Sequence, residues 1–251
     1  MRVLETSAGA RWNISENIVL STEAFFKRYY KMPLSVRDGI PLACKGNDYG
    51  IVGNETLVST AQGKAYGVEL SARWIVAGKL NMLGSATIFK SIYRSNKNEA
   101  YLPSAWDNRF IINWGGTYNL PKEWSIGAKL SCIGGAPYTP YDTELSSLKM
   151  AWDVQGRAYY NYSLYNSFRM KPFAQLDIRI DKNWYFNEWM LGAYIDLQNV
   201  TFSKLKQQDA LLSTGVLENP NLPENEQKYI MKSIKQEVGS IIPSFGITVE
   251  F

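Results

Sequence analysis

The chain has 251 residues, of which 45% are hydrophobic and 14% aromatic, and its formal net charge at pH 7 is only +4. This charge is too small for the basic surface that nucleic-acid binding requires, so we expect no nucleic-acid partner. The sequence contains no histidine and only two cysteines, which excludes histidine-dependent triads, most zinc sites and a disulfide framework.

Hydrophobic residues occur in short runs, the longest of three or four residues. A transmembrane helix requires about 20 mostly apolar residues, so membrane-spanning helices are excluded. A transmembrane β-barrel is not excluded, because its strands alternate and their average hydropathy resembles that of a soluble protein. Residues 1–5 lack the apolar region of a secretory signal. We therefore expect a fragment of a longer exported protein, or a start codon inside a longer gene.

Alternation of apolar and polar residues is the main pattern of the chain, and it predicts about nine strands. In chain order these are 7–15, 18–27, 66–74, 80–88, 109–120, 125–132, 175–181, 188–198 and 241–251. A soluble β-sandwich also alternates, but its strands are usually about 5–6 residues long. The strands predicted here are long enough to cross a bilayer at a tilt of about 45°. One face also carries Arg, Lys, Asp and Glu, which a dry core could not hold unpaired. The pattern therefore predicts an all-β fold, an antiparallel transmembrane β-barrel.

Short and long connections alternate between these strands. The short ones are 15–17, 77–79, 120–123 and 183–187, and the long ones are 31–60, 94–106, 135–172 and 201–239. This alternation is typical of outer-membrane barrels with short periplasmic turns and long extracellular loops. It predicts that the last strand runs downward and leaves Phe251 at the periplasmic rim.

Aromatic residues cluster at the predicted short turns. Those in or next to a turn are Trp12, Trp74, Trp124, Trp184 and Trp189, with Tyr118 and Tyr185 nearby. The preference of aromatic residues for strands explains their presence but not this clustering. We therefore expect an aromatic girdle at the inner membrane interface.

Seven stretches of the chain follow one another in a recognisable order. They are 21–30 (STEAFFKRYY), 63–70 (GKAYGVEL), 107–109 (DNR), 134–141 (GGAPYTPY), 176–179 (LDIR), 196–200 (DLQNV) and 242–251 (IPSFGITVEF). Together they resemble TonB-dependent outer-membrane receptors, most of all those of the Bacteroidetes type. One departure is Phe110, which stands where the family usually has histidine.

The resemblance implies that residues 1–251 form one incomplete domain, about nine C-terminal strands of a barrel of about 22 strands, without its plug. Such receptors import a scarce nutrient with energy from the TonB complex, which contacts the missing N-terminal part. Outer-membrane lipid is an expected partner, and a surface lipoprotein is compatible but not required. The resemblance also implies that the barrel-assembly machinery reads the last strand as a signal, through Phe245, Ile247, Val249 and Phe251.

No catalytic constellation is found, so we expect neither enzyme activity nor a cofactor. Carboxylates on the polar face are expected to pair across strands with basic residues rather than to act as acid and base. The carboxylates are Asp177, Asp181, Glu188 and Asp196, and the basic residues are Arg73, Arg109, Lys129 and Arg179. Acidic loop residues are too scattered for a calcium loop. Cys44 lies in a predicted loop and Cys132 in a strand, which does not favour a bridge between them.

Tyrosines are concentrated in the long connection 135–172, and they are the candidate ligand contacts. They are Tyr138, Tyr141, Tyr159, Tyr160, Tyr162 and Tyr165. A flat apolar ring with a hydroxyl suits sugars, peptides or planar chelates. Alternatively, these rings anchor the loop over the barrel or lie in the outer interface. In the next long connection, residues 223–234 predict a short helix with Pro223 near its start.

Two functions follow from this pattern. The leading hypothesis is the C-terminal barrel portion of a TonB-dependent outer-membrane receptor for active uptake of a nutrient. The alternative is a small complete outer-membrane barrel with a pore, structural or adhesive role. The sequence does not select among siderophores, cobalamin, glycans and peptides as the ligand.

Overall fold

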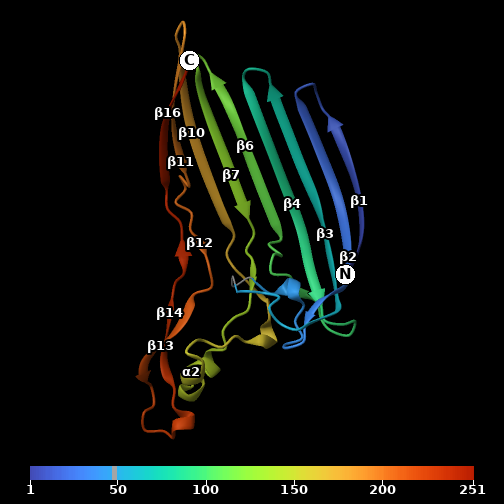
Figure 1. Cartoon of the computed structure of the whole chain (residues 1–251), viewed down its shortest axis with the longest axis vertical. Coiled ribbons are helices and arrows are strands. Elements are labelled where there is room, and N and C mark those ends of the chain that lie inside the picture. The colour runs from blue at the N-terminus through green and yellow to red at the C-terminus, as the bar shows by residue number, and fades with distance from the viewer. Residues whose placement is uncertain (47–49) are drawn as a thin grey trace.

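The fold is built on one antiparallel sheet whose strands are neighbours in chain order (Figure 1). A computed structural model describes residues 1–46 and 50–251. The sheet consists of β1 (Arg2–Asn13), β2 (Ile18–Ser35), β3 (Leu57–Val76), β4 (Leu80–Arg94), β6 (Phe110–Leu120), β7 (Trp124–Ile133), β10 (Phe173–Tyr185), β11 (Met190–Gln198) and β16 (Ile242–Glu250). The short strand β5 (Leu102–Pro103) pairs with β4 outside this order. The antiparallel all-β prediction is confirmed.

The remaining elements all lie in the long connections. They are η1 (Leu42–Cys44), β8 (Pro137–Tyr138), α1 (Thr143–Ser147), α2 (Lys149–Gln155), η2 (Tyr162–Leu164), β9 (Phe168–Arg169), β12 (Leu205–Lys206), β13 (Ala210–Leu217), η3 (Glu224–Glu226), β14 (Tyr229–Ile234) and β15 (Glu237–Val238). Among the described residues, no helix is long and apolar enough to span a membrane. The helix predicted over 223–234 is wrong, because only the turn η3 is helical and β14 pairs with β13 instead.

The two ends of the sheet differ in their connections. After β1, β3, β6 and β10 the chain turns within four residues, and these turns lie at the top of Figure 1. The long connections and small elements all lie at the bottom, with the β13–β14 hairpin farthest out. We call these the turn end and the loop end. Short and long connections thus alternate as the sequence predicts.

β2 and β3 are longer than predicted, because both strands continue past a bulge that interrupts the alternation. The loop between them therefore covers 36–56 and not the predicted 31–60. The register between these strands shifts between Tyr29 and Pro33, and Lys31 has a positive φ of 52°. A bulge inserts an unpaired residue and breaks the period of two, so the alternation is lost although the strand continues.

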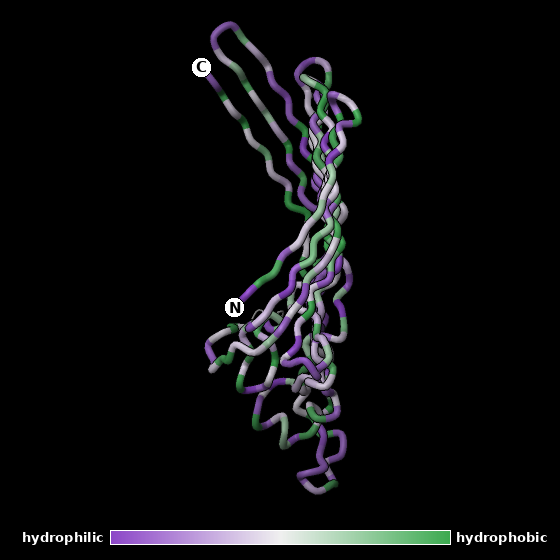
Figure 2. Tube along the Cα trace, turned by 90° about the vertical axis from the view of Figure 1, so that its right-hand side faces the viewer, coloured by the Kyte–Doolittle hydropathy of each residue, from purple (hydrophilic) through white to green (hydrophobic). Residues whose placement is uncertain are grey.

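The register confirms the predicted apolar face across the sheet. Val68 is paired with Ala24 on one side and Ile88 on the other, and Ile88 faces Phe110. Many of these side chains are open to the surroundings, with Ile88 69% exposed. Seen from the side, the sheet is one curved layer that is not closed (Figure 2). Within the described residues, β1 and β16 each pair on one side only.

Five of the eight tryptophans lie at the turn end, and four of these are on the apolar face. Trp12, Trp74, Trp124 and Trp184 all share that face by register. The ammonium group of Lys182 lies 5.8 Å from the Trp124 ring and 5.4 Å from the Trp184 ring. This is the row of aromatic residues that the sequence predicts.

The opposite face is polar, but its charges pair differently from the prediction. Arg179 bonds Asp181 two residues along its own strand, at 2.7 Å, and stacks on the Tyr194 ring at 3.9 Å. The cross-strand pair on this face is Lys27–Glu5, at 2.8 Å. Arg179 and Asp181 lie on one face of one strand, so the fork of the arginine reaches the nearer carboxylate along the chain.

Candidate functional site

The long loops fold over the polar face at the loop end and form a small core there. Ile40, Cys44 and Tyr93 are its buried members, and Tyr29 and Met32 pack against them. Tyr29 and Tyr93 lie on the polar face by register, because both face Gly63. The loops 36–56, 95–109 and 134–172 meet at this core, and we call their described residues the loop cap.

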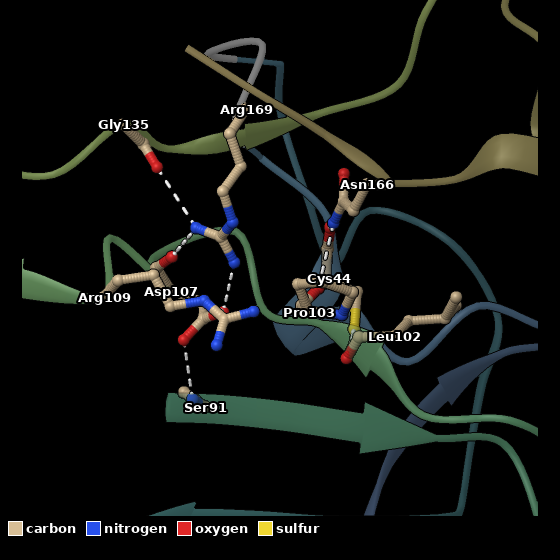
Figure 3. A network of polar contacts seen from close by, with 9 residues as sticks. All are labelled: Cys44, Ser91, Leu102, Pro103, Asp107, Arg109, Gly135, Asn166 and Arg169. Carbon is tan, nitrogen blue, oxygen red and sulfur yellow. Dashed lines mark hydrogen bonds and ion pairs between the residues drawn. The ribbon is translucent and has the colours of Figure 1, made fainter. Parts of the chain in front are cut away.

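A buried carboxylate joins two loops of the cap to the sheet (Figure 3). Asp107 is 0% exposed and is bonded by Arg169 at 2.5 Å and by Arg109 at 3.1 Å. Its carboxylate also accepts a hydrogen bond from the Ser91 N–H of β4 at 2.8 Å. Charge-assisted hydrogen bonds of this kind are about twice as strong as neutral ones. The pairing expected between Arg109 and a strand carboxylate is therefore wrong, because Asp107 is nearer and buried.

Asn166 is the second buried connection between the loops (Figure 3). Its side-chain amide donates to the Cys44 carbonyl at 2.8 Å and to the Pro103 carbonyl at 3.0 Å, and its backbone N–H donates to the Thr139 hydroxyl. Asn166 has a positive φ of 51°, a conformation that asparagine tolerates better than most residues. One side chain therefore joins all three loops of the cap.

Two glycines allow loop 134–172 to lie this close to its neighbours. A Cβ at Gly134 would lie 1.9 Å from the Asn108 carbonyl oxygen, and one at Gly135 would lie 1.7 Å from the Met170 carbonyl oxygen. The Gly135 carbonyl accepts a hydrogen bond from Arg169 at 3.1 Å. The glycine pair at the start of the GGAPYTPY stretch is thus required by close backbone approach.

Four of the six predicted tyrosines form one continuous run of rings. Tyr141 stacks on Tyr160 at 5.0 Å, Tyr160 meets Tyr162 edge-on at 6.4 Å, and Tyr162 stacks on Tyr165 at 6.2 Å. The run begins beside α1 and ends at η1, where the Tyr165 hydroxyl donates to the Cys44 carbonyl at 3.3 Å. Tyr162 is 63% exposed, so the run presents an open aromatic surface at the loop end.

The other two tyrosines lie outside the run. Tyr138 pairs with Phe168 at 5.9 Å on the small β8–β9 ribbon. The Tyr159 hydroxyl donates to the Ala151 carbonyl of α2 at 2.9 Å. Both rings therefore make contacts within loop 134–172 itself, whereas the predicted alternative to ligand contact was to anchor the loop over the barrel or to lie in the outer interface.

A charged cluster holds the two ends of loop 36–56 together. Lys45 bonds Asp38 at 2.7 Å and Glu55 at 2.6 Å, and the buried Ser35 hydroxyl donates to Glu55. Burial by itself would raise the pKa of Asp38, but the hydrogen bonds from Lys45 and the Ile40 N–H lower it overall. The hydrogen bonds from Lys45 and Ser35 lower the pKa of Glu55. Both carboxylates are thus stabilised in their charged form.

Both cysteines are free thiols. Cys44 is 0% exposed, and burial raises the pKa of its thiol to about 12. A buried protonated thiol is unreactive, so its reactivity reports opening of the loop cap. Within the described residues, no group of three or more His, Cys, Asp or Glu side chains could hold a metal ion.

The residues proposed as an assembly signal lie on the outermost strand. Phe245, Ile247 and Val249 of β16 point to the apolar face, opposite Ile195, Ala193 and Leu191 of β11. Phe245 is 86% exposed, and Phe251 is fully exposed after the strand ends. Val249 and Phe251 lie at the turn end of the last strand, opposite the loop cap, and Phe245 lies near the middle of the strand.

The fold is that of outer-membrane β-barrel proteins, and three solved structures similar to this chain are uptake receptors or transporters. The chain is similar to the ferric yersiniabactin uptake receptor FyuA from Yersinia pestis, with 14% identity and a TM-score of 0.53. It is also similar to the ferric-catecholate import receptor Fiu from E. coli K12, with 10% identity and a TM-score of 0.54. The ferric citrate transporter FecA gives 10% identity and a TM-score of 0.56.

These matches cover 99%, 98% and 99% of this chain but only 30%, 27% and 31% of the three receptors, in the same order. The chain therefore spans about a third of the length of the structures it matches. A scan against protein-family models and a search of curated proteins found no match.

Proposed function

We propose that the chain is the C-terminal barrel portion of a TonB-dependent outer-membrane receptor that actively imports a nutrient. The observation that carries this proposal is the register-aligned apolar face, which ends in a tryptophan row at the turn end. An exposed apolar surface of this extent requires an apolar solvent, and a lipid bilayer supplies one. The likeness to three ferric-chelate receptors, and the order of the sequence motifs, which favours the Bacteroidetes type, point the same way.

The tyrosine run is the proposed ligand-contacting surface, and a ferric chelate is the first ligand class to test. Stacked rings offer flat apolar faces with hydroxyl groups, which suits a planar or aromatic chelate. The run of Tyr141, Tyr160, Tyr162 and Tyr165 is aligned across the cap and partly open. Support for a chelate also comes from the names of the three similar receptors, each of which handles a ferric complex.

The test uses the complete protein that carries this chain, expressed in the outer membrane of a host with or without TonB. Uptake of radioactive iron is measured for citrate, catecholate and phenolate chelates. We expect uptake of at least one chelate, and its loss without TonB. Flux that persists without TonB would favour the alternative, a passive pore.

Two tyrosine variants separate ligand binding from loop support. Tyr162→Ala removes the most open ring of the run and is expected to weaken chelate binding on the order of tenfold. Tyr159→Phe removes only the hydrogen bond to Ala151 and serves as the matched control. Equal loss of binding in both variants, or in neither, would contradict the proposed surface.

The terminal residues are proposed to act in assembly and not in transport. Phe245, Ile247, Val249 and Phe251 form an exposed apolar row that ends in an aromatic residue. Deletion of Phe251 is expected to lower the amount of protein inserted in the outer membrane, measured by surface labelling. Chelate binding per inserted molecule should stay unchanged. Normal insertion without Phe251 would refute this role.

A further inference from the structure

Four cations lie together on the apolar face, near the loop end of β2, β3 and β4. Lys64 and Arg28 are direct register partners, and Lys64 also faces Ile92, whose neighbours two positions away are Lys90 and Arg94. All four occupy positions of the same parity as Val68 and Ile88, so their side chains leave the sheet on the apolar side. We call Arg28, Lys64, Lys90 and Arg94 the basic patch.

The basic patch has no counter-ion among the described residues. In the part of the chain that the structure describes, none of its members forms an ion pair, whereas Lys27 on the opposite face pairs with Glu5 at 2.8 Å. By the alternation, β2, β3 and β4 place Glu23 and Glu69 on the polar face and no acidic residue on the apolar face. Like charges directly opposite each other on neighbouring strands are destabilising. An anion from outside the chain would remove this cost.

Aromatic rings contact three of these cations, and Arg28 lies 5.1 Å from the centroid of the Tyr30 ring. The Tyr101 ring lies 4.6 Å from the Lys64 ammonium and 4.7 Å from the Arg94 guanidinium, so two cations share one ring. Arg94 also donates to the Gln62 side chain and the Lys97 carbonyl. Its Nε is the one buried side-chain nitrogen or oxygen atom of the described residues without a hydrogen-bond partner. The cations of the basic patch are thus held in place, and Arg94 can still donate a hydrogen bond.

The level of the patch matches one boundary of a bilayer. Trp74 marks the turn end of the apolar face on β3, and Lys64 is ten residues away on the same strand. Ten residues span about 33 Å along a strand, or about 25 Å of height at the usual tilt, which is the height of a barrel's apolar band. Phe26 and Tyr66, with ring centroids 6.5 Å apart, lie level with Lys90 and just inside the level of Arg28, Lys64 and Arg94. The order from apolar band to aromatic pair to cations is that of a hydrocarbon–headgroup interface.

From these features we infer that the basic patch binds the phosphate of an outer-leaflet lipid headgroup. The inference rests on the proposed outer-membrane location. A lipid places its acyl chains on the apolar face beside Val68 and Ile88 and brings its phosphate to the level of Arg28 and Lys64. Cations beside an anionic membrane surface attract phosphate-bearing lipids. A free anion lacks the acyl chains and gains nothing from the apolar face.

The test measures lipid binding by the complete protein in mixed micelles that contain diphosphoryl lipid A or its dephosphorylated form. Wild-type protein should retain the phosphorylated form in native mass spectrometry and release it as salt is raised. In Arg28→Gln/Lys64→Gln the apparent affinity should fall on the order of tenfold or more. The charge-preserving pair Arg28→Lys/Lys64→Arg should bind as wild type does, which separates charge from folding.

Lys182→Gln is the matched control, because Lys182 is also a cation on the apolar face but lies at the turn end. Equal loss in this variant, or equal retention of dephosphorylated lipid, would overturn the proposal. Complete displacement by inorganic phosphate would also overturn it and indicate a free-anion site. Iron uptake with and without TonB is measured on the same variants. TonB-independent uptake with intact lipid binding would refute the transport role alone.

Discussion

Two of the contacts between loops at the loop end are ion-paired, and they differ in burial. Asp107 bonds Arg169 and Arg109 with its side chain fully buried. In the other contact, Lys228 bonds Glu144 at 2.6 Å and Lys149 bonds Glu224 at 2.7 Å, with the two glutamate side chains 85% and 69% exposed. We call these the buried network and the exposed contact.

The difference in burial indicates which contact holds the loop cap closed. A buried carboxylate that loses its partners is strongly destabilising, because no water replaces them. An exposed pair is solvated before and after it breaks, so its loss changes little. The three loops joined by Asp107 and Asn166 should therefore move as one unit, and the β13–β14 hairpin should move against them.

The largest effect is expected for Asp107→Asn, which leaves Arg169 and Arg109 without their carboxylate. Removing one partner of a buried pair costs about 3–5 kcal/mol. The cap should open more often, and the modification rate of Cys44 by a thiol reagent should rise on the order of 100-fold or more. The measurement uses a Cys132→Ala background, so that Cys44 is the single thiol within residues 1–251, and the modified site is identified by peptide mass. An unchanged rate would show that the buried network does not hold the cap.

A smaller effect is expected at Asn166. Asn166→Gly keeps the positive φ but removes the donor for the Cys44 and Pro103 carbonyls, at a cost of about 1–3 kcal/mol. Asn166→Ala should cost about 1 kcal/mol more, because alanine is strained at this φ. For both variants the measurement is the rate at which a thiol reagent modifies Cys44. Asn161→Ala is the control, since among the described residues its side chain bonds only Ser163 of η2. A rate for Asn166→Gly equal to this control would contradict the role.

Acidification should loosen loop 36–56. The pKa values of Asp38 and Glu55 are lowered from their ordinary values of 3.8 and 4.5. Groups with lowered pKa values stabilise the fold above their ordinary pKa, and this stability is lost as the pH falls through the folded values. Protection of residues 36–44 against hydrogen exchange, relative to the intrinsic rate at each pH, should therefore fall as the pH falls below about 4. In Lys45→Met this protection should be lower at neutral pH and depend less on pH. A parallel pH profile in the variant would refute the assignment.

Much of this fold could be predicted from alternation alone. Apolar and polar residues alternate wherever a strand has one apolar and one polar face. The strands and their two faces could therefore be predicted from alternating positions such as Val68 and Ile88. The alternation fails at Lys31, where a bulge breaks the period while the strand goes on. The strand ends 28–35 and 57–65 were therefore missed in part.

The buried network could not be predicted, because its partners are far apart in the chain. Asp107 and Arg169 are brought together only when loop 134–172 folds back over β4, and nothing local at either residue signals this. The DNR stretch includes Asp107 and Arg109, but the alternation predicts a strand carboxylate as the partner of Arg109. For the tyrosines, composition predicted the cluster but not that Tyr138 and Tyr159 lie outside the run.

The smallest effect is expected at the exposed contact, and it should depend on salt. Lys149→Gln/Lys228→Gln should leave Cys44 modification within about twofold of wild type, since exposed pairs contribute little. Hydrogen exchange of β14 should accelerate slightly at low salt, and the difference should vanish near 1 M salt, where the screening length is about 3 Å. Tyr229→Phe removes a hydrogen bond to Asp153 and should show no comparable salt dependence. If the lysine variant opened the cap as much as Asp107→Asn does, burial would not be what separates the two contacts.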